Sequence, residues 1–427
     1  MKIGVVGLWH LGTVAAACFA EICEQVIAVD DPPVVANLVR GQLPVDEPGL
    51  TDLTAAAVKR GTLRFSDDIN DLADVDLLFV AYDTPVDDQD NADVEFVQKR
   101  LLQVLQRLKD GTTVVISSQL PVGFTNKTAA YCREAMPDKT LHFAYSPENL
   151  RLGKAIKCFK HPDRIVVGTD SEVACARVNE IFGKLTDNFI WMSPTSAEMT
   201  KHALNAFLGL SIAFINEIAT LCEVVGADAR EVEKGLKSEE RIGQRAPLSP
   251  GGAFAGGTLA RDISYLVQFG KQHGSPTALL SAIRVSNEEH KTWAVRRLQR
   301  ELGDLRGKVV AILGLTYKPG TNTLRRSSAL ELCRALAQAG SEVRAHDPAV
   351  DHLPADFAGV RLMSSPAEAY AGAGAVVLAT AWPEYQNITA EQLRASMAHP
   401  LVLDANGFLR DSLDGQQSIR YVAVGKG

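Results

Sequence analysis

Short apolar runs alternate with helical stretches over roughly the first 195 residues of the chain. The runs lie at residues 2–6, 26–29, 77–81, 113–116, 141–144 and 165–167. The stretches between them include an Ala-rich segment at 13–22 and an amphipathic segment at 94–108. Apolar runs of this length are typical of buried strands, and their alternation with helices predicts a parallel, doubly wound sheet.

The hydrophobic pattern changes at about residue 195. Thr195 and Glu198 have the spacing of a capping box, and an apolar helical pattern then continues past Leu221 with Gly209 as its interior glycine. Further helical segments, separated by Gly/Pro-rich connections such as residues 247–257, reach about residue 300. We therefore expect a long helix that opens a helical linking domain.

A second strand–glycine start lies at residues 307–314. A helical pattern at 327–338 and a strand pattern at 342–345 follow, and later apolar runs lie at 375–380 and 401–403. The sequence thus predicts an α/β protein with two Rossmann-like doubly wound domains joined by a long central helix or helical domain. The expected domain boundaries are 1–195, 196–300 and 301–427.

Composition and charge narrow the class of protein. The chain has 427 residues, of which 22% are charged, and its formal net charge is −7. These values are average for a soluble globular protein and exclude a disordered or collagen-like chain. A negative net charge also argues against a general polyanion binder, so we expect no nucleic acid partner.

Cysteine usage and the N-terminal pattern indicate the compartment. The seven cysteines are scattered, with no CxxC motif and no Cys/His cluster at metal spacing, so we expect reduced thiols and no bound metal. No continuous apolar run reaches the roughly 18–20 residues of a membrane span, and the N-terminus begins directly with a strand pattern. These features predict a cytoplasmic protein without a membrane partner.

The turn after the first predicted strand carries part of a dinucleotide-binding pattern. Gly7 and Gly12 occupy the first and third glycine positions of such a turn, whereas Trp9 stands at the middle one. Asp30 follows the second predicted strand, where an acid binds the ribose hydroxyls of a dinucleotide. On its own this pattern also fits an α/β fold with no ligand at the turn, in which Asp30 is a simple turn acid.

Several longer motifs follow one another along the chain. They lie at residues 44–50 (PVDEPGL), 120–123 (LPVG), 146–150 (SPENL), 162–168 (PDRIVVG), 197–201 (AEMTK) with Asn205, 241–243 (RIG) and 317–319 (YKP) with Arg325. Together and in this order they resemble the motifs of the UDP-glucose/GDP-mannose dehydrogenase family, over nearly the whole chain. So many ordered matches are far more specific than a single glycine motif.

The resemblance implies an N-terminal domain for the cofactor NAD, a C-terminal domain for a nucleotide sugar, and a homodimer that pairs through the central helix. It also implies a reaction in which the C6 alcohol of a UDP- or GDP-sugar is oxidised to a carboxylate in two NAD-dependent steps, with the intermediate aldehyde held on a cysteine. Such a reaction serves polysaccharide biosynthesis. The hydrophobic pattern alone leaves an alternative to the homodimer, because packing between the two α/β domains of one chain would bury the same apolar face of the helix.

The resemblance also assigns functions to individual positions. The positions expected to bind NAD are Gly7, Leu11, Gly12, Asp30, Thr84, Gln119, Arg261 and Arg325. Those expected to bind the nucleotide sugar are Glu148, Asn149, Leu150, Arg151, Lys201, Asn205, Arg241, Gly257 and Lys318. The positions expected to take part in catalysis are Lys201, Asn205, Asp262, Glu148 and Thr258.

The chemistry of these residues suits the first oxidation. Lys201 and Asn205 lie four positions apart and share a face of the predicted helix, where an ammonium and a carboxamide can bind water and stabilise alkoxide charge as a hydride leaves. Asp262 can orient a water molecule or accept a proton. Without the resemblance, each of these residues is better explained as a solvated surface group.

The chain departs from the family motifs at positions that serve the second oxidation. Thr258 stands where the family's catalytic loop has its cysteine. A nearby cation can bring a thiol to thiolate at neutral pH, whereas an alcohol needs a dedicated base, for which Lys201 is the obvious candidate. Gln119 replaces a threonine and Leu152 a second glutamate, both of which help to hold catalytic water in the family, and Arg261 replaces a lysine thought to contact the cofactor.

Two further substitutions bear on cofactor binding. Trp9 and Asp83 stand where the family usually has glycine, and each would weaken the binding of a pyrophosphate unless its side chain points away. Contact of Trp9 with the dinucleotide and packing of Trp9 under the loop fit the sequence about equally.

Three hypotheses remain open at this point. In the first, the protein is an NAD-dependent oxidoreductase of a nucleotide sugar that stops at the aldehyde or oxidises another carbinol. In the second, it completes the four-electron reaction, with Thr258 as an inefficient nucleophile or a hydrated aldehyde as the second substrate. In the third, it is a catalytically inactive relative that binds a nucleotide sugar and regulates or scaffolds polysaccharide synthesis.

Overall fold

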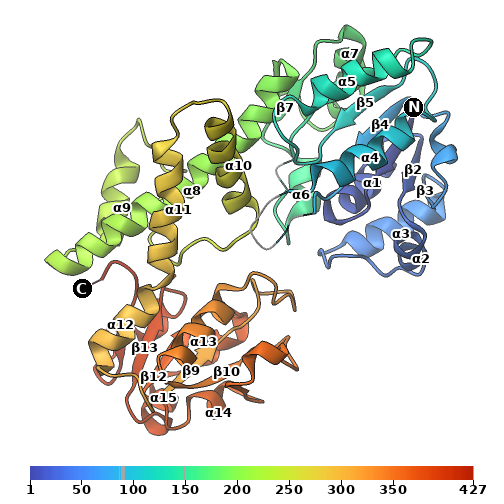
Figure 1. The fold of residues 1–427 in the computed structure, drawn as a ribbon. Coiled ribbons are helices and arrows are strands. Elements are labelled where there is room, and N and C mark those ends of the chain that lie inside the picture. The colour runs from blue at the N-terminus through green and yellow to red at the C-terminus, as the bar shows by residue number, and fades with distance from the viewer. Residues whose placement is uncertain (86, 88–91, 149, 427) are drawn as a thin grey trace. The chain divides into compact units, whose positions relative to one another are not determined.

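The computed structural model describes residues 1–85, 87, 92–148 and 150–426 of the chain. These residues form two compact units, Met1–Leu204 and Asn205–Gly427. Each unit contains one sheet with helices beside it (Figure 1).

The first unit is built on an eight-stranded sheet. Its strands are β1 (Lys2–Val6), β2 (Gln25–Val29), β3 (Leu63–Ser66), β4 (Leu77–Val80), β5 (Thr113–Ile116), β6 (His142–Tyr145), β7 (Ile165–Gly168) and β8 (Phe189–Met192), in the order β3-β2-β1-β4-β5-β6-β7-β8. Neighbouring strands are parallel except β6 and β7, which meet in one antiparallel pair, Tyr145 opposite Gly168. The predicted doubly wound sheet is confirmed, and β3 and β8 are strands that the apolar pattern did not predict.

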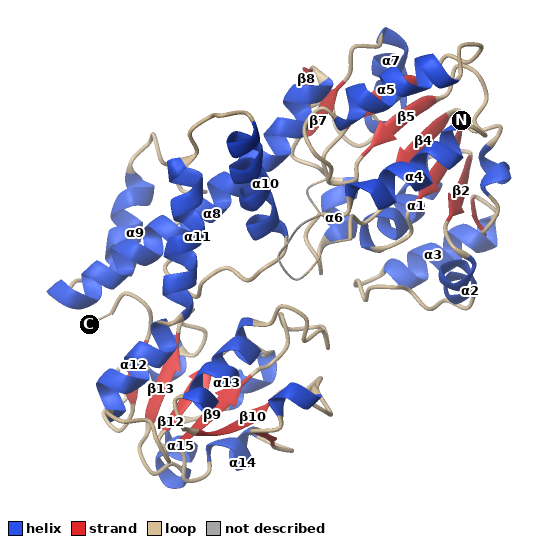
Figure 2. Ribbon diagram, in the orientation of Figure 1, coloured by secondary structure: helices blue, strands red, loops and turns tan. Residues whose placement is uncertain are grey.

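Helices lie on both faces of this sheet (Figure 2). They are α1 (His10–Ile22), α2 (Pro32–Val39), α3 (Leu50–Arg60), α4 (Val94–Leu105), α5 (Phe124–Ala135), α6 (Ala155–Lys160) and α7 (Glu172–Phe182), with a short 3₁₀ turn at Ile69–Leu72. Residues of α1, α3, α6 and α7 share one buried cluster with Val5 and Phe79, whereas residues of α4 and α5 share another with Val6 and Val80. Because successive strand residues point to opposite faces, the two clusters lie on opposite sides of the sheet.

The long helix α8 (Pro194–Val225) begins where the sequence predicts it, but its cap is different. The N–H of Ser196 donates to Oγ of Ser193 at 3.2 Å. Glu198 is fully buried and accepts instead from the N–H groups of Gly123 (2.5 Å) and Thr125 (2.8 Å), at the N-terminus of α5. The predicted capping box is therefore wrong, because the Glu198 carboxylate caps a neighbouring helix rather than its own.

α8 also meets the length and hydropathy criteria for a membrane-spanning helix, although no continuous apolar run of that length exists. Its 32 residues contain an 18-residue window of mean hydropathy 1.7, of which 39% is buried. A single helix of this kind is a weak indication, because the core helix of a globular protein meets the same criteria. The absence of a membrane partner therefore stays a prediction.

The second unit continues α8 with four further helices and then a six-stranded sheet. The helices that precede the sheet are α9 (Ala229–Ser238), α10 (Thr258–Gln272), α11 (Ala278–Lys291) and α12 (Trp293–Leu302). The strands are β9 (Val309–Leu313), β10 (Glu342–His346), β11 (Val360–Leu362), β12 (Ala375–Leu378), β13 (Leu401–Asp404) and β14 (Arg420–Val422), in the order β11-β10-β9-β12-β13-β14. The remaining helices are α13 (Ser328–Gln338), α14 (Pro366–Tyr370), α15 (Ala390–Ser396) and α16 (Arg410–Leu413), with 3₁₀ turns at Ala355–Phe357 and Pro383–Asn387.

All neighbouring strands of this second sheet are parallel. Its first strand, β9, is followed by Gly314 in a left-handed conformation (φ +91), where an added Cβ would lie 2.4 Å from Cβ of Thr380. The predicted architecture of two Rossmann-like sheets with a long central helix is thus confirmed.

Candidate functional site

The turn between β1 and α1 is built so that only glycine fits its key positions. Gly7 has φ +87, and an added Cβ would lie 2.4 Å from the main-chain nitrogen of Tyr82. A Cβ on Gly12 would lie 1.9 Å from the carbonyl oxygen of Gly7. The turn from β1 into α1 is therefore short. The N–H groups of the first turn of α1, including those of Leu11 and Gly12, have no partners inside the helix. Such a helix N-terminus binds the pyrophosphate of a dinucleotide.

Asp30 is fixed at the end of β2 beside this turn. Its Oδ2 accepts from the N–H of Leu8 at 2.5 Å, and its Oδ1 accepts from the N–H of Asp31 at 2.7 Å. The guanidinium of Arg100 lies 3.2 Å from Oδ1 of Asp30 and 5.2 Å from the centre of the Tyr82 ring. Sequence reasoning missed Arg100, because it lies on α4 and no motif connects it with Asp30.

Trp9 is not packed beneath the turn, because half of its surface is exposed. Trp9 precedes the first residue of α1 with φ −79, so its backbone needs no glycine, and its side chain is 52% exposed. Asp83 is also exposed. Its neighbour Thr84 is buried and donates from Oγ1 to the carbonyl oxygen of Gln119 at 2.8 Å. This bond joins the loops after β4 and β5, next to the point where the strand order reverses between β1 and β4.

Lys201 is buried against the loop that carries Glu148. Its side chain is 7% exposed, and its Nζ donates to the carbonyl oxygen of Glu148 at 2.5 Å and lies 3.4 Å from Oε1 of the same residue. Oε2 of Glu148 accepts from the N–H of Leu150 at 2.6 Å. Arg151 is exposed, and Asn149 lies outside the described residues. Lys201 is therefore not a solvated surface group.

Asn205 and Asp262 form a buried pair in the second unit. They are 4% and 1% exposed, and Nδ2 of Asn205 donates to Oδ2 of Asp262 at 2.5 Å. The pair connects α8 with α10. A solvated surface group is therefore also the wrong description for these two residues, and their burial makes their mutual orientation rigid.

Thr258 is the first residue of α10 and is exposed. It follows Gly257, which has φ +112, and an added Cβ on Gly257 would lie 3.6 Å from Nη1 of Arg326. Arg326 has φ 61, and among the described residues it is the one non-glycine residue with a positive φ. A non-glycine residue in this conformation is uncommon and is associated with functional loops. Sequence reasoning singled out its neighbour Arg325 and missed Arg326.

Four side chains hold the loop that precedes Thr258, and we call them the loop clamp. Asn287 brackets Phe254, because its Oδ1 accepts from the Phe254 N–H at 2.9 Å and its Nδ2 donates to the Phe254 carbonyl at 2.8 Å. The other bonds run from Gly251 N to Asn216 Oδ1 (3.0 Å), from Gly252 N to Asn406 Oδ1 (2.9 Å) and from His290 Nε2 to Gly251 O (2.8 Å). The clamp fixes the main chain of the loop from α8, α11 and the segment after β13.

The other predicted residues of the second unit lie nearer its surface. The side chain of Arg241 is 87% exposed and pairs with Oε1 of Glu239 at 2.8 Å. Arg325 is exposed, whereas Arg261 and Lys318 are half-buried. Within the described ranges, no group of three or more His, Cys, Asp or Glu side chains is placed to hold a metal ion.

The cysteines lie elsewhere. All seven are free thiols, and burial raises the pKa of Cys18 and of Cys333 to about 12, so these two are unreactive at neutral pH. None of the seven stands at position 258.

Comparison with family models decides the identity of this arrangement. Three models match in order along the chain: the NAD binding domain of the UDP-glucose/GDP-mannose dehydrogenase family at residues 1–186, its central domain at 195–289, and its UDP binding domain at 311–411. The chain belongs to the UDP-glucose/GDP-mannose dehydrogenase family. It is thus an NAD-dependent nucleotide-sugar dehydrogenase by class, with NAD as the cofactor of its first unit.

Relatives of known name match over the full length of the chain. It is 34% identical to a UDP-glucose 6-dehydrogenase of Rhizobium meliloti, with 100% of both chains covered. It is 31% identical to UDP-glucose 6-dehydrogenase TuaD of Bacillus subtilis, over 99% of this chain and 92% of that one. Among solved structures, a UDP-glucose dehydrogenase from Pyrobaculum islandicum is 29% identical and has a TM-score of 0.87 over 100% of this chain and 98% of that one.

Proposed function

We propose that this protein oxidises the C6 alcohol of a UDP-sugar, in the manner of a UDP-glucose 6-dehydrogenase. The observation that carries the proposal is the burial of Lys201 against Glu148, together with the Asn205–Asp262 pair, in a chain that matches UDP-glucose 6-dehydrogenases from end to end. A buried ammonium is costly unless it has a function or a partner. UDP is preferred over GDP because the matching C-terminal model is a UDP binding domain.

In the proposed reaction NAD, when bound, supplies the hydride acceptor. The Gly7–Gly12 turn would hold the pyrophosphate at the N-terminus of α1, and Asp30 would accept hydrogen bonds from the ribose. The Lys201 ammonium stabilises the alkoxide that develops as the substrate alcohol loses its proton. Asp262, oriented by Asn205, positions a water molecule or takes up that proton.

We further propose that the reaction stops after one two-electron oxidation. Thr258 offers an alcohol where a thiolate is needed to hold the aldehyde, and it is not followed or preceded by a histidine that could act as its base. Leu152 has no carboxylate to hold the hydrolytic water, and it is 36% exposed. Both changes fall on the second half of the reaction and leave Lys201, Asn205 and Asp262 in place.

We also propose a homodimer that pairs through α8. Phe207, Phe214 and Leu221 recur at seven-residue spacing on this helix and are 61%, 45% and 61% exposed. A row of exposed large apolar side chains is typical of an interaction surface. The alternative, in which this face is covered within one chain, would leave the protein monomeric.

Free thiols support our proposal that the enzyme works in the cytoplasm and supplies polysaccharide biosynthesis.

The test of function is incubation of the purified protein with NAD and a panel of UDP- and GDP-sugars. NADH absorbance and product mass are followed together. We expect one NADH for each UDP-glucose consumed and a product two hydrogens lighter than the substrate. Formation of the acid would favour the four-electron reaction, and tight binding of a sugar nucleotide without NADH would favour the inactive relative.

A further inference from the structure

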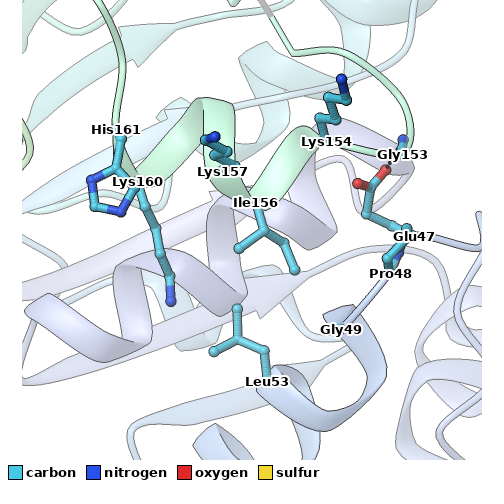
Figure 3. A pocket seen from close by; sticks show the side chains of 10 residues that line it. All are labelled: Glu47, Pro48, Gly49, Leu53, Gly153, Lys154, Ile156, Lys157, Lys160 and His161. Atoms are coloured by element: carbon cyan, nitrogen blue, oxygen red, sulfur yellow. Dashed lines mark hydrogen bonds between the residues drawn. The ribbon is translucent and has the colours of Figure 1, made fainter.

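A cavity lies in the first unit of the protein. It has a volume of about 630 Å³ and lies between the start of α3 and one face of α6 (Figure 3). This volume is in the range of small-molecule sites. None of the residues expected to bind NAD or the nucleotide sugar is among those that line it.

The lining of this cavity is strongly basic. Three lysines line it at a spacing of three residues: Lys154, which precedes α6, and Lys157 and Lys160 within α6. His161, the residue after α6, also lines it. Lys160 forms an ion pair with Glu21. Within the described ranges of the chain, no carboxylate lies within 4.0 Å of the ammonium groups of Lys154 and Lys157. These two cations are therefore available to an anion.

The carboxylate in the lining, Glu47, is already committed to the protein. It is 3% exposed, and it accepts from the N–H groups of Gly153 and Ala155, each at 2.8 Å. Its Oε2 also lies 3.1 Å from Nε2 of His10, the first residue of α1. Glu47 thus holds the start of α6 and does not compete for the two lysines.

Apolar side chains from both α3 and α6 also line the cavity. Leu53 of α3 and Ile156 of α6 face one another across the cavity, with Pro48 and Gly49 beside them (Figure 3). A ligand that fills this space therefore presents an anionic group to Lys154 and Lys157 and an apolar or aromatic body to Leu53 and Ile156.

We propose that this cavity is a second ligand site, which binds a phosphate monoester with an apolar or aromatic body. Its residues do not take part in the proposed hydride transfer, so it is an effector site rather than part of the catalytic centre. Its connection to catalysis is Glu47, which joins the start of α6 to His10 at the start of α1. Because the effector and the NAD pyrophosphate are both anions bound at elements that Glu47 joins, occupancy of the cavity weakens NAD binding.

The binding test uses phenyl phosphate as the probe, with inorganic phosphate for comparison. Isothermal titration calorimetry is carried out on the full chain with saturating NAD, so that the N-terminus of α1 is occupied. We expect phenyl phosphate to bind, and to bind more tightly than inorganic phosphate because of Leu53 and Ile156. Absence of phenyl phosphate binding to the native chain overturns the proposal.

A matched pair of double variants locates the site. Lys154→Ala with Lys157→Ala should weaken phenyl phosphate binding about tenfold or more, which corresponds to about 1.4 kcal/mol. Lys99→Ala with Lys127→Ala, two exposed lysines of α4 and α5, should leave the affinity unchanged. All four lysines are exposed, so the variants are expected to fold. Equal affinity in both double variants overturns the location.

The coupling is measured separately, as the dissociation constant of NAD with and without saturating phenyl phosphate. We expect NAD to bind about fivefold more weakly with phenyl phosphate present, and this change to disappear in the Lys154→Ala and Lys157→Ala double variant. An NAD affinity that does not respond to phenyl phosphate overturns the effector function.

Discussion

The main-chain N–H of Leu8 donates to Oδ2 of Asp30 across 2.5 Å. The second sheet repeats this relationship, since the N–H of Leu315 donates to Oδ2 of Asp347 at 2.6 Å. There, however, the carboxylate also accepts from the indole Nε1 of Trp382 at 3.0 Å and is buried. The carboxylate of Asp30 can thus still accept hydrogen bonds from a ligand, whereas that of Asp347 is covered by Trp382. The first unit is therefore the one suited to a dinucleotide.

Asp30→Asn should weaken NAD binding about tenfold, or about 1.4 kcal/mol, because a neutral amide accepts weaker hydrogen bonds from the ribose than a carboxylate does. The variant should also reduce the preference for NAD over NADP. Arg100 now pairs with the carboxylates of both Asp30 and Asp31, and removal of the Asp30 charge would leave its guanidinium freer to bind the 2′-phosphate of NADP. Dissociation constants for both cofactors test this. Asp67→Asn, on the loop after β3, is the control and should change neither constant.

Thr258→Cys should add the second oxidation. A thiol at the start of α10 can hold the aldehyde, so the yield should rise from one NADH to two for each sugar nucleotide, with the acid as product. NADH stoichiometry and product mass measure the change. Thr258→Ser supplies an alcohol of similar size and should give no acid. If the cysteine variant forms the same product as the native chain, the missing thiol does not explain the proposed two-electron reaction.

Glu198→Gln should destabilise the first unit by about 2–3 kcal/mol. The substitution removes a buried charge that accepts from Gly123 N, Thr125 N and Thr125 Oγ1 (2.7 Å). Urea unfolding monitored by circular dichroism measures the loss. Glu217→Gln, at an exposed position of the same helix, should leave the midpoint unchanged. An unchanged midpoint for Glu198→Gln would show that the α5 cap contributes little to stability.

His290 should make the second unit less stable in acid. Burial lowers the pKa of His290 below its ordinary value of 6.5, outweighing the hydrogen bond to Gly251, which raises it. Neutral His290 therefore stabilises the fold above about pH 6.5, and this contribution is lost as the pH falls through the lowered pKa.

Thermal unfolding of the native chain and of His290→Gln between pH 7 and pH 5 measures this effect. Glutamine can donate to the same carbonyl of Gly251 but does not titrate. The melting temperature of the native chain should fall more over this pH range than that of the variant. Parallel pH profiles would show that protonation of His290 does not matter for stability.

Phe214→Glu should disrupt the proposed homodimer. A carboxylate in the centre of an apolar α8 interface would be desolvated without a partner, so the variant should sediment as a monomer. Val173→Glu places the same charge at an exposed apolar position of α7 and should leave the native assembly intact. A native chain that is itself monomeric in sedimentation velocity would rule out the α8 dimer.

The sequence predicts the buried strands of both sheets well. The strand β5 is predicted with the bounds it has, because four consecutive buried apolar or β-branched residues leave no other interpretation. By contrast, β8 is an edge strand with exposed Ile190 and Trp191, so it lacks a buried run. The helix α4 ends at Leu105 rather than at 108, since pattern alone locates a helix end poorly.

The site is less predictable because its partners are distant in sequence. Arg100 contacts Asp30 across 70 positions, and no local signal connects them. Glu198 has the spacing of a capping box, yet its carboxylate reaches Gly123, 75 positions away. Family resemblance identified Lys201 and Asn205, but their burial follows from tertiary packing that no spacing rule contains.

The loop clamp has a consequence for how such enzymes diverge. Asn216, Asn287, Asn406 and His290 hold main-chain atoms of Gly251, Gly252 and Phe254, so these anchors do not use the side chain at position 258. Selection can therefore exchange the residue there without rebuilding the loop. The proposed loss of the nucleophile can then arise by one substitution, on a loop that keeps its anchors.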